Sequence, residues 1–244
     1  MGAIRYTHLP SVTTVPVVGL SERYPVRRVY CVGRNYADHA IEMGVDPRTD
    51  PPFFFCKPAD TVFAPEDQGD VLEVPYPPQT SNLHHEVELV VAIGEGGRNI
   101  DMRRAHEHIF GYAVGIDMTR RDLQLAMRKA GKPWEIGKTF ERCAPMSAIC
   151  PLHLCGRIDQ GEIALTVQGQ PRQKSDLSKL IWSVSEIIAD LSRLYTLRPG
   201  DLIFTGTPEG VGPVVPGDTM LASIGGLATL AVKVAEAQAD EVAA

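Results

Sequence analysis

The sequence predicts a β-rich α+β fold built as one compact unit. Its 19 Pro and 22 Gly are scattered rather than clustered, which is typical of tight turns between many short elements. Strand-like apolar runs outnumber segments with helical periodicity. No repeat or low-complexity tract interrupts this pattern, so we expect short strands with a few packing helices.

The composition narrows the possible partners of the chain. Its 244 residues carry 24 Lys plus Arg against 30 Asp plus Glu, and this net charge of −6 disfavours binding to nucleic acid or to an anionic membrane. No apolar run approaches the roughly 20 residues of a membrane helix, and we find no secretory signal. The five cysteines are an odd number and form no C-x-x-C pair. We therefore expect a cytoplasmic protein with reduced thiols.

The expected strands are short apolar segments bounded by turn residues. Gly169-Gln170 and Gly225-Gly226 lie between such segments and predict hairpins. The pattern predicts eight strands, at residues 29–33, 53–57, 87–94, 111–117, 163–168, 202–205, 219–224 and 227–234.

Three segments are predicted to be helices, namely 35–43, 119–130 and 183–194, and the last two have the apolar spacing of helices. Gly44 follows the first segment in the position that ends many helices. Thr119 is the expected N-cap of the second, and Gly131 its expected end. The third has one continuous apolar stripe, so we interpret it as a packing helix.

Residues 82–93 read NLHHEVELVVAI, a strand-like run that contains Glu86 and Glu88. Residues two apart on a strand point to the same face. Burying two unpaired carboxylates among apolar neighbours would cost several kcal/mol, so a positive charge is expected between them. Asp117 ends the next strand and completes a set of three carboxylates, the kind of oxygen site that suits magnesium, manganese or calcium.

Two other interpretations of this segment remain open. The first is an ordinary ion-paired surface, which the apolar neighbours of Glu86 and Glu88 disfavour. The second is a zinc site, which would need His84 and His85 to replace oxygen donors and has no thiolate nearby in the sequence. We expect both histidines to support the site rather than bind the metal.

The helix expected after Asp117 places Arg121 and Gln124 three residues apart, on one face and near its start. Arg121 has the forked geometry that pairs with a carboxylate, and Gln124 can donate to a carbonyl oxygen. Lys138 follows in PWEIGKTF, where an ammonium close to the three carboxylates would stabilise an oxyanion. Spacing alone does not place Lys138 there.

His39 and Glu42 have the spacing of neighbours on a helix. A carboxylate that orients an imidazole raises its basicity, as a base that activates water requires, although a surface pair has the same spacing. Nearby glycines favour a mobile lid helix.

Residues 205–212 read TGTPEGVG, a turn whose backbone amides and Thr207 could bind an anion. The turn lacks the G-K-[ST] of a P-loop, so we reject a nucleotide site.

Six motifs occur in a characteristic order: GRNYADH, FFCKP, NLHHEVEL, GIDMTRRDLQ, PWEIGKTF and GDLIFTGTPEGVGP. In this order they resemble the fumarylacetoacetate hydrolase family, in its short acylpyruvase and fumarylpyruvate hydrolase branch. The resemblance implies a β-roll with a short lid helix, in a homodimer. It also implies three segments: an N-terminal one with the lid helix (1–70), a catalytic domain (71–236) and a flexible tail (237–244).

The resemblance further implies a role for each matched residue. Mg²⁺ or Mn²⁺, or Ca²⁺ in crystals, would be bound by Glu86, Glu88 and Asp117. The catalytic residues would be His39, Glu42 and Lys138. The residues that contact substrate would be Arg34, Tyr36, Lys57, Arg121, Gln124 and Thr207.

The activity that these features imply is metal-dependent hydrolysis of a carbon–carbon bond in a small 2,4-diketo acid. Fumarylpyruvate is the first choice, because of the resemblance to the short branch and because Arg34 and Lys57 add positive charge that would meet a second carboxylate. Acetyl or another small acyl group stays open as the group that is cleaved off. Decarboxylation of oxaloacetate is the main alternative, and isomerase or hydratase action on another 2-oxo acid is a related one. From a different class, the three carboxylates would form a non-catalytic metal-binding scaffold.

Overall fold

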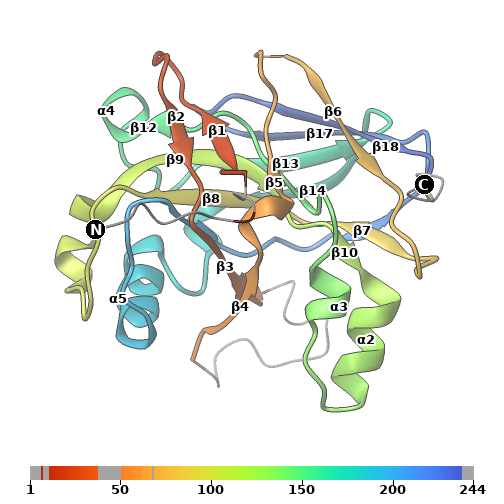
Figure 1. Ribbon diagram of the computed structural model, residues 1–244, viewed down its shortest axis with the longest axis horizontal. Helices are drawn as coiled ribbons and strands as arrows, with labels where there is room; N and C mark the ends of the chain where they lie inside the picture. Colours follow the sequence, from red (N-terminus) through yellow and green to blue (C-terminus); the bar gives the residue numbers. More distant parts are fainter. Residues whose placement is uncertain (1–6, 8–10, 38–50, 68, 238–244) are drawn as a thin grey trace.

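The computed structural model describes residues 7, 11–37, 51–67 and 69–237, and its β-rich α+β architecture confirms the expected fold class (Figure 1). A six-stranded mixed sheet forms the centre. Strands from both sides of residue 70 share this sheet, and the expected division of the chain there stays a prediction. The order of its strands is β12 (Cys150–Pro151), β9 (Ile109–Ile116), β8 (Val87–Ile93), β15 (Asp201–Phe204), β3 (Arg28–Gly33) and β4 (Phe53–Lys57).

A second sheet of five strands packs against the first. Both expected hairpins are confirmed in it, and the first turns at Gln168 and Gly169, whose φ angles of 51° and 72° fit a tight two-residue turn. The order of its strands is β14 (Gln170–Asp176), β13 (Glu162–Val167), β17 (Thr219–Ile224), β18 (Leu230–Ala235) and β6 (Val71–Pro75).

Seven short strands of the described residues form three small sheets, and of these only β7, which lies in the strand-like run 82–93, was expected from the sequence. At two or three residues each, they are too short to show a periodic pattern. They are β10 (Thr119–Arg120) with β7 (Leu83–His85) and β16 (Gly212–Val214), β1 (Thr14–Pro16) with β2 (Arg23–Pro25), and β11 (Ala144–Pro145) with β5 (Val62–Phe63).

Strand β8 is buried along its whole length, because it separates two hydrophobic clusters. Leu89 and Val91 belong to the larger cluster, together with the inner face of the five-stranded sheet. Val90 and Ala92 point the opposite way into a smaller cluster that includes residues of β1 and β2. Successive side chains of a strand alternate between faces, so Glu88 lies on the side of the smaller cluster.

The helices lie at the edges of the sheets. In Figure 1, α2 and α3 lie together at the lower right and α5 lies on the left. Ser183 caps α5 through reciprocal hydrogen bonds with Glu186. The helices are α2 (Arg121–Lys129), α3 (Glu135–Lys138), α4 (Leu152–Cys155) and α5 (Val184–Leu194), with 3₁₀ turns η1 (Ala59–Thr61), η2 (Met102–His108) and η3 (Leu177–Lys179).

Two of the three expected helices are confirmed, one of them with a correction. Helix α2 begins at Arg121, and Thr119 is not its cap because it lies in β10 and its hydroxyl accepts a hydrogen bond from Lys138. Most of the expected helix 35–43 falls on residues 38–43, which lie outside the described residues. In the described part of the chain, none of the helices has the length and apolar character needed to cross a membrane.

Replacing Leu89 by alanine should lower the free energy of unfolding by about 2–5 kcal/mol, because this fully buried side chain packs between the two large sheets. Denaturant unfolding measures the change. Leu221→Ala on β17 is the control, since its side chain is 47% exposed and should cost less than about 1 kcal/mol. Equal losses in the two variants would contradict this packing.

Candidate metal and substrate site

The three predicted carboxylates meet on one face of the central sheet. Glu88 lies in β8, Glu86 precedes this strand and Asp117 follows β9, and the two strands are antiparallel neighbours. The backbone N–H of Asp117 donates to the carbonyl oxygen of Glu86 at 2.8 Å, so these residues lie opposite each other. One carboxylate oxygen from each of the three lies within 4.8 Å of the others, and all three residues are buried. We call them the acidic trio.

Two buried lysines hold the trio together. Lys138 in α3 donates to Glu86 and to Asp117, at 2.7 Å in both cases. Lys57 in β4 pairs with the second oxygen of Asp117 at 2.9 Å. Burial alone would lower the pKa of each ammonium, but the nearby carboxylates outweigh this effect and raise both pKa values. Both lysines therefore stay charged.

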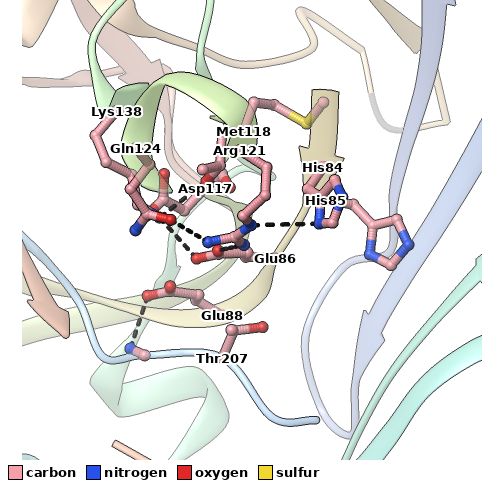
Figure 2. Close-up of polar contacts among 12 residues, drawn as sticks. His84, His85, Glu86, Glu88, Asp117, Met118, Arg121, Gln124, Lys138 and Thr207 are labelled. Atoms are coloured by element: carbon pink, nitrogen blue, oxygen red, sulfur yellow. Dashed lines mark hydrogen bonds and ion pairs between the residues drawn. The ribbon is translucent and has the colours of Figure 1, made fainter. Parts of the chain in front are cut away.

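Glu88 has a different environment from the other two members of the trio. Its carboxylate accepts a hydrogen bond from the backbone N–H of Gly206 at 2.7 Å, shown in Figure 2. Burial, and then the charges of Asp117 and Glu86, raise its pKa well above the usual value. An added positive charge would let Glu88 ionise, which is what a metal ion at this point would supply.

Arg121, the first residue of α2, connects this helix to the acidic trio. It donates to Glu86, to the side-chain oxygen of Gln124 and, at 3.4 Å, to Nδ1 of His84 (Figure 2). Burial and the charge of Arg121 lower the pKa of His84 to about 4, so the ring is neutral at pH 7 and accepts this bond. His84 therefore orients Arg121, in the supporting role expected from the sequence.

A glycine lets α3 approach α2 closely enough to bring Lys138 to the trio. A Cβ atom added at Gly137 would lie 2.7 Å from the backbone nitrogen of Gln124, closer than real Cβ atoms come to backbone. A larger residue at position 137 would push the two helices apart. The position of Lys138, which the sequence alone did not give, follows from this contact.

The trio forms the floor of a pocket whose walls include Arg121 and Gln124 of α2 and Thr207. Lys57 does not line it: its side chain is fully buried behind Asp117, beside the sulfur of Cys143 at 3.2 Å. Tyr36 is also buried beneath the surface, and His39 and Glu42 lie outside the described residues. The predicted residues that line the pocket are Arg34, Glu86, Glu88, Asp117, Arg121, Gln124, Lys138 and Thr207.

Two buried amides that the sequence analysis missed hold the walls of this pocket. Gln173 in β14 accepts from His85 and from the backbone N–H of Val87, and donates to the hydroxyl oxygen of Thr207 at 2.8 Å. Asn35 donates to the carbonyl oxygen of Thr205 at 2.8 Å and so fixes the start of the turn that carries Thr207. Nothing in the sequence near Gln173 marks it, whereas Asn35 stands within the GRNYADH motif.

Comparisons with known proteins identify the family of this chain. The family model described as "Fumarylacetoacetate (FAA) hydrolase C-terminal" matches residues 28–235. A fumarylpyruvate hydrolase of Ralstonia sp. is 49% identical over 194 residues, which cover 80% of this chain and 98% of that protein. A mitochondrial oxaloacetate decarboxylase of Dictyostelium discoideum is 39% identical over 203 residues, which cover 83% of this chain and 91% of that protein.

A solved structure of a related protein has the same fold as this chain. The fumarylpyruvate hydrolase of Pseudomonas aeruginosa, in complex with Mn²⁺ and pyruvate, superposes with a TM-score of 0.93. It is 54% identical in sequence, and the match covers 95% of this chain and all of that one. The ordered motifs, the sheet topology and these matches together show that the chain belongs to the fumarylacetoacetate hydrolase family.

Proposed function

We propose that the protein uses a divalent metal ion to hydrolyse a carbon–carbon bond in a 2,4-diketo acid. Fumarylpyruvate is the first choice of substrate, and its products are fumarate and pyruvate. The observation that carries this proposal is the buried acidic trio on the floor of a pocket with Arg121 and Gln124 in its wall. The relatives named fumarylpyruvate hydrolase, 49% and 54% identical to this chain, support it.

Mg²⁺ or Mn²⁺ is the metal that we propose, with Glu86, Glu88 and Asp117 as its protein ligands. The donor set fits, because clustered carboxylate oxygens suit these hard ions, and also Ca²⁺, better than zinc. The related structure that holds Mn²⁺ and pyruvate supports this choice. When bound, such an ion acts as a Lewis acid for the negative charge that develops on the pyruvyl part of the substrate.

The pocket walls would orient the substrate. The Gln124 amide oxygen accepts from Arg121, so its N–H groups are the donors that can meet a substrate oxygen. The Thr207 hydroxyl oxygen accepts from Gln173, so its own O–H is a second donor at the opposite wall. Arg121 and Lys138 would keep Glu86 in place while substrate binds.

We propose His39 as the base that activates water and Glu42 as the carboxylate that orients it, on their spacing in the sequence. His39 would remove a proton from a water molecule that attacks the 4-oxo carbon. The bond between carbons 3 and 4 then breaks, and its electron pair stays with the pyruvyl part, which takes up a proton. The other part leaves as fumarate.

Decarboxylation of oxaloacetate is the second candidate for the reaction. The relative named oxaloacetate decarboxylase, 39% identical to this chain, supports this candidate. Loss of carbon dioxide from oxaloacetate also leaves its electron pair on a pyruvyl fragment, but it needs no attacking water. The same floor and walls would therefore serve both reactions. The two candidates differ in their need for His39.

We further propose a homodimer in the cytoplasm. The dimer rests on the family resemblance. All five cysteines are free, which fits a reducing compartment. The division of the chain into the segments 1–70, 71–236 and 237–244 is also part of this proposal.

Replacing His39 by alanine should lower kcat for fumarylpyruvate by about 10²–10⁴-fold, because a positioned base contributes that much. Loss of diketo-acid absorbance measures hydrolysis, with Mg²⁺ or Mn²⁺ and with EDTA, and pyruvate release measures oxaloacetate decarboxylation. Decarboxylation should survive in the variant, and His153→Ala, at an exposed position in α4, is the control. Equal loss of both activities would exclude His39 as the water-activating base.

Loss of a residue that only hydrogen-bonds a metal ligand typically weakens metal binding by ~10–100-fold. Replacing Glu88 by glutamine should weaken Mn²⁺ binding by more than this, because the variant loses a charged ligand. Calorimetric titration of the folded protein with Mn²⁺ measures this. Glu162→Gln on β13, an exposed carboxylate, should leave the affinity unchanged. If Glu88→Gln binds Mn²⁺ as well as the wild type, the trio is not the metal site.

A further inference from the structure

Three aromatic side chains line the pocket above the acidic trio, and the proposed mechanism does not use them. Phe53 and Phe55 come from β4, and Trp134 directly precedes α3. All three residues are half-buried, so part of each ring surface stays open to the pocket that they line. We call these three residues the aromatic wall.

Strand β4 extends from the outer part of the pocket to a point behind its floor. Phe53, Phe55 and Lys57 follow one another at intervals of two residues and therefore lie on one face of the strand. Lys57 pairs with Asp117 at 2.9 Å, so this end of β4 lies at the trio. Two residues of a strand span about 7 Å. Phe55 therefore stands one such step from Lys57, and Phe53 stands two steps away.

The start of α3 adds Trp134 to these two rings. The ammonium of Lys138, which contacts Glu86, lies 5.2 Å from the centre of the Phe55 ring. The ring centres of Trp134 and Phe55 are 6.3 Å apart, and Trp134 meets Phe53 edge to face at 5.2 Å. The aromatic wall is therefore continuous from the floor of the pocket to Phe53.

A glycine gives Phe53 its place in the wall. Gly33 is the partner of Phe53 in the pairing of β3 with β4. A Cβ atom added at Gly33 would overlap the ring of Phe53, so this ring occupies the space that a side chain at position 33 would fill. The guanidinium of Arg34 lies over the same ring, 4.8 Å from its centre. These contacts fix the orientation of the Phe53 ring.

We propose that the aromatic wall binds the acyl part of the substrate and selects a flat, unsaturated acyl chain over a saturated chain of the same length. This inference rests on the proposed function, since it places the 2-oxo acid end of the substrate at the trio. Aromatic rings make offset-stacked or edge-to-face contacts with other flat π-systems. A chain conjugated with the 4-oxo group is flat before it binds, whereas a saturated chain loses rotational freedom on binding. The fumaryl group has such a flat chain, and an acetyl group is too short to extend along the wall.

The kinetic test compares crotonylpyruvate with butyrylpyruvate. Both acyl groups have four carbons and no charge, and only the crotonyl chain is unsaturated. Phe53→Leu keeps an apolar side chain but removes the ring. It should lower the ratio of kcat/KM for crotonylpyruvate to that for butyrylpyruvate by about 3–10-fold, as loss of an aromatic contact does. Comparing this ratio between variant and wild type cancels the different intrinsic reactivities of the two substrates.

Phe54→Leu is the matched control for this test. It makes the same replacement at the next position of β4, on the opposite face of the strand. Phe54 packs against the larger hydrophobic cluster and is not among the described residues that line the pocket. Phe54→Leu, and also Phe53→Tyr, which keeps the ring, should leave the ratio within about twofold of wild type. An unchanged ratio in Phe53→Leu, or an equal fall in Phe54→Leu, would overturn the role of the wall and leave the hydrolase in place.

A binding test separates this inference from the proposed function. The chain has two tryptophans, so a Trp182→Phe background leaves Trp134 as the fluorescent reporter, and free tryptophan corrects for collisional quenching. With Mn²⁺ present, crotonate should change the emission of Trp134 at a concentration at least about threefold lower than butyrate, and Phe53→Leu should remove this preference. Equal binding of the two acids would overturn the role of the wall. A preference for crotonate without cleavage of any diketo acid would instead refute the proposed hydrolase while the wall stands.

Discussion

The burial of three carboxyl groups on one face of a sheet is the constraint on which this structure depends. Glu86, Glu88 and Asp117 would be prohibitively costly in such a place without compensation. Three cations supply it: Lys57 from β4, Lys138 from α3 and Arg121 from α2. Because each comes from a different element, the sheet order and the docking of both helices must be correct before the charges balance. A chain that folds otherwise would leave buried charges unpaired.

The same constraint explains details that otherwise look unrelated. Gly137 permits the close approach of α3 to α2 that delivers Lys138. His84 stays neutral beside Arg121 and turns that guanidinium toward Glu86. Gly206 offers its backbone N–H to Glu88. One backbone amide of the turn 205–212, where an anion was expected to bind, therefore contacts a carboxylate of the protein itself.

The sequence was a good guide wherever a periodic pattern carries the information. Alternation placed Glu86 and Glu88 on one face, and all eight expected strands and α5 lie close to their observed bounds, whereas β6 and β14 were not among the expected strands. Contacts between distant elements leave no such local pattern. That is why Gln173 was missed, why Lys57 was expected in the pocket rather than behind Asp117, and why Thr119 was taken for a helix cap although its hydroxyl serves Lys138. The roles of His39 and Glu42 stay predictions.

The raised pKa of Glu88 has a thermodynamic consequence. Without a metal, Glu88 keeps its proton and the three cations face two carboxylates, whereas a divalent cation would let Glu88 ionise and would leave a local surplus of two positive charges, which a substrate with two carboxylates would neutralise. Each partner then enters a site that the other has made more favourable. Because such coupling free energies are reciprocal, the substrate tightens the hold on the cation by the same factor by which the cation tightens the hold on the substrate. A divalent cation and a dianionic substrate would therefore be retained as a pair.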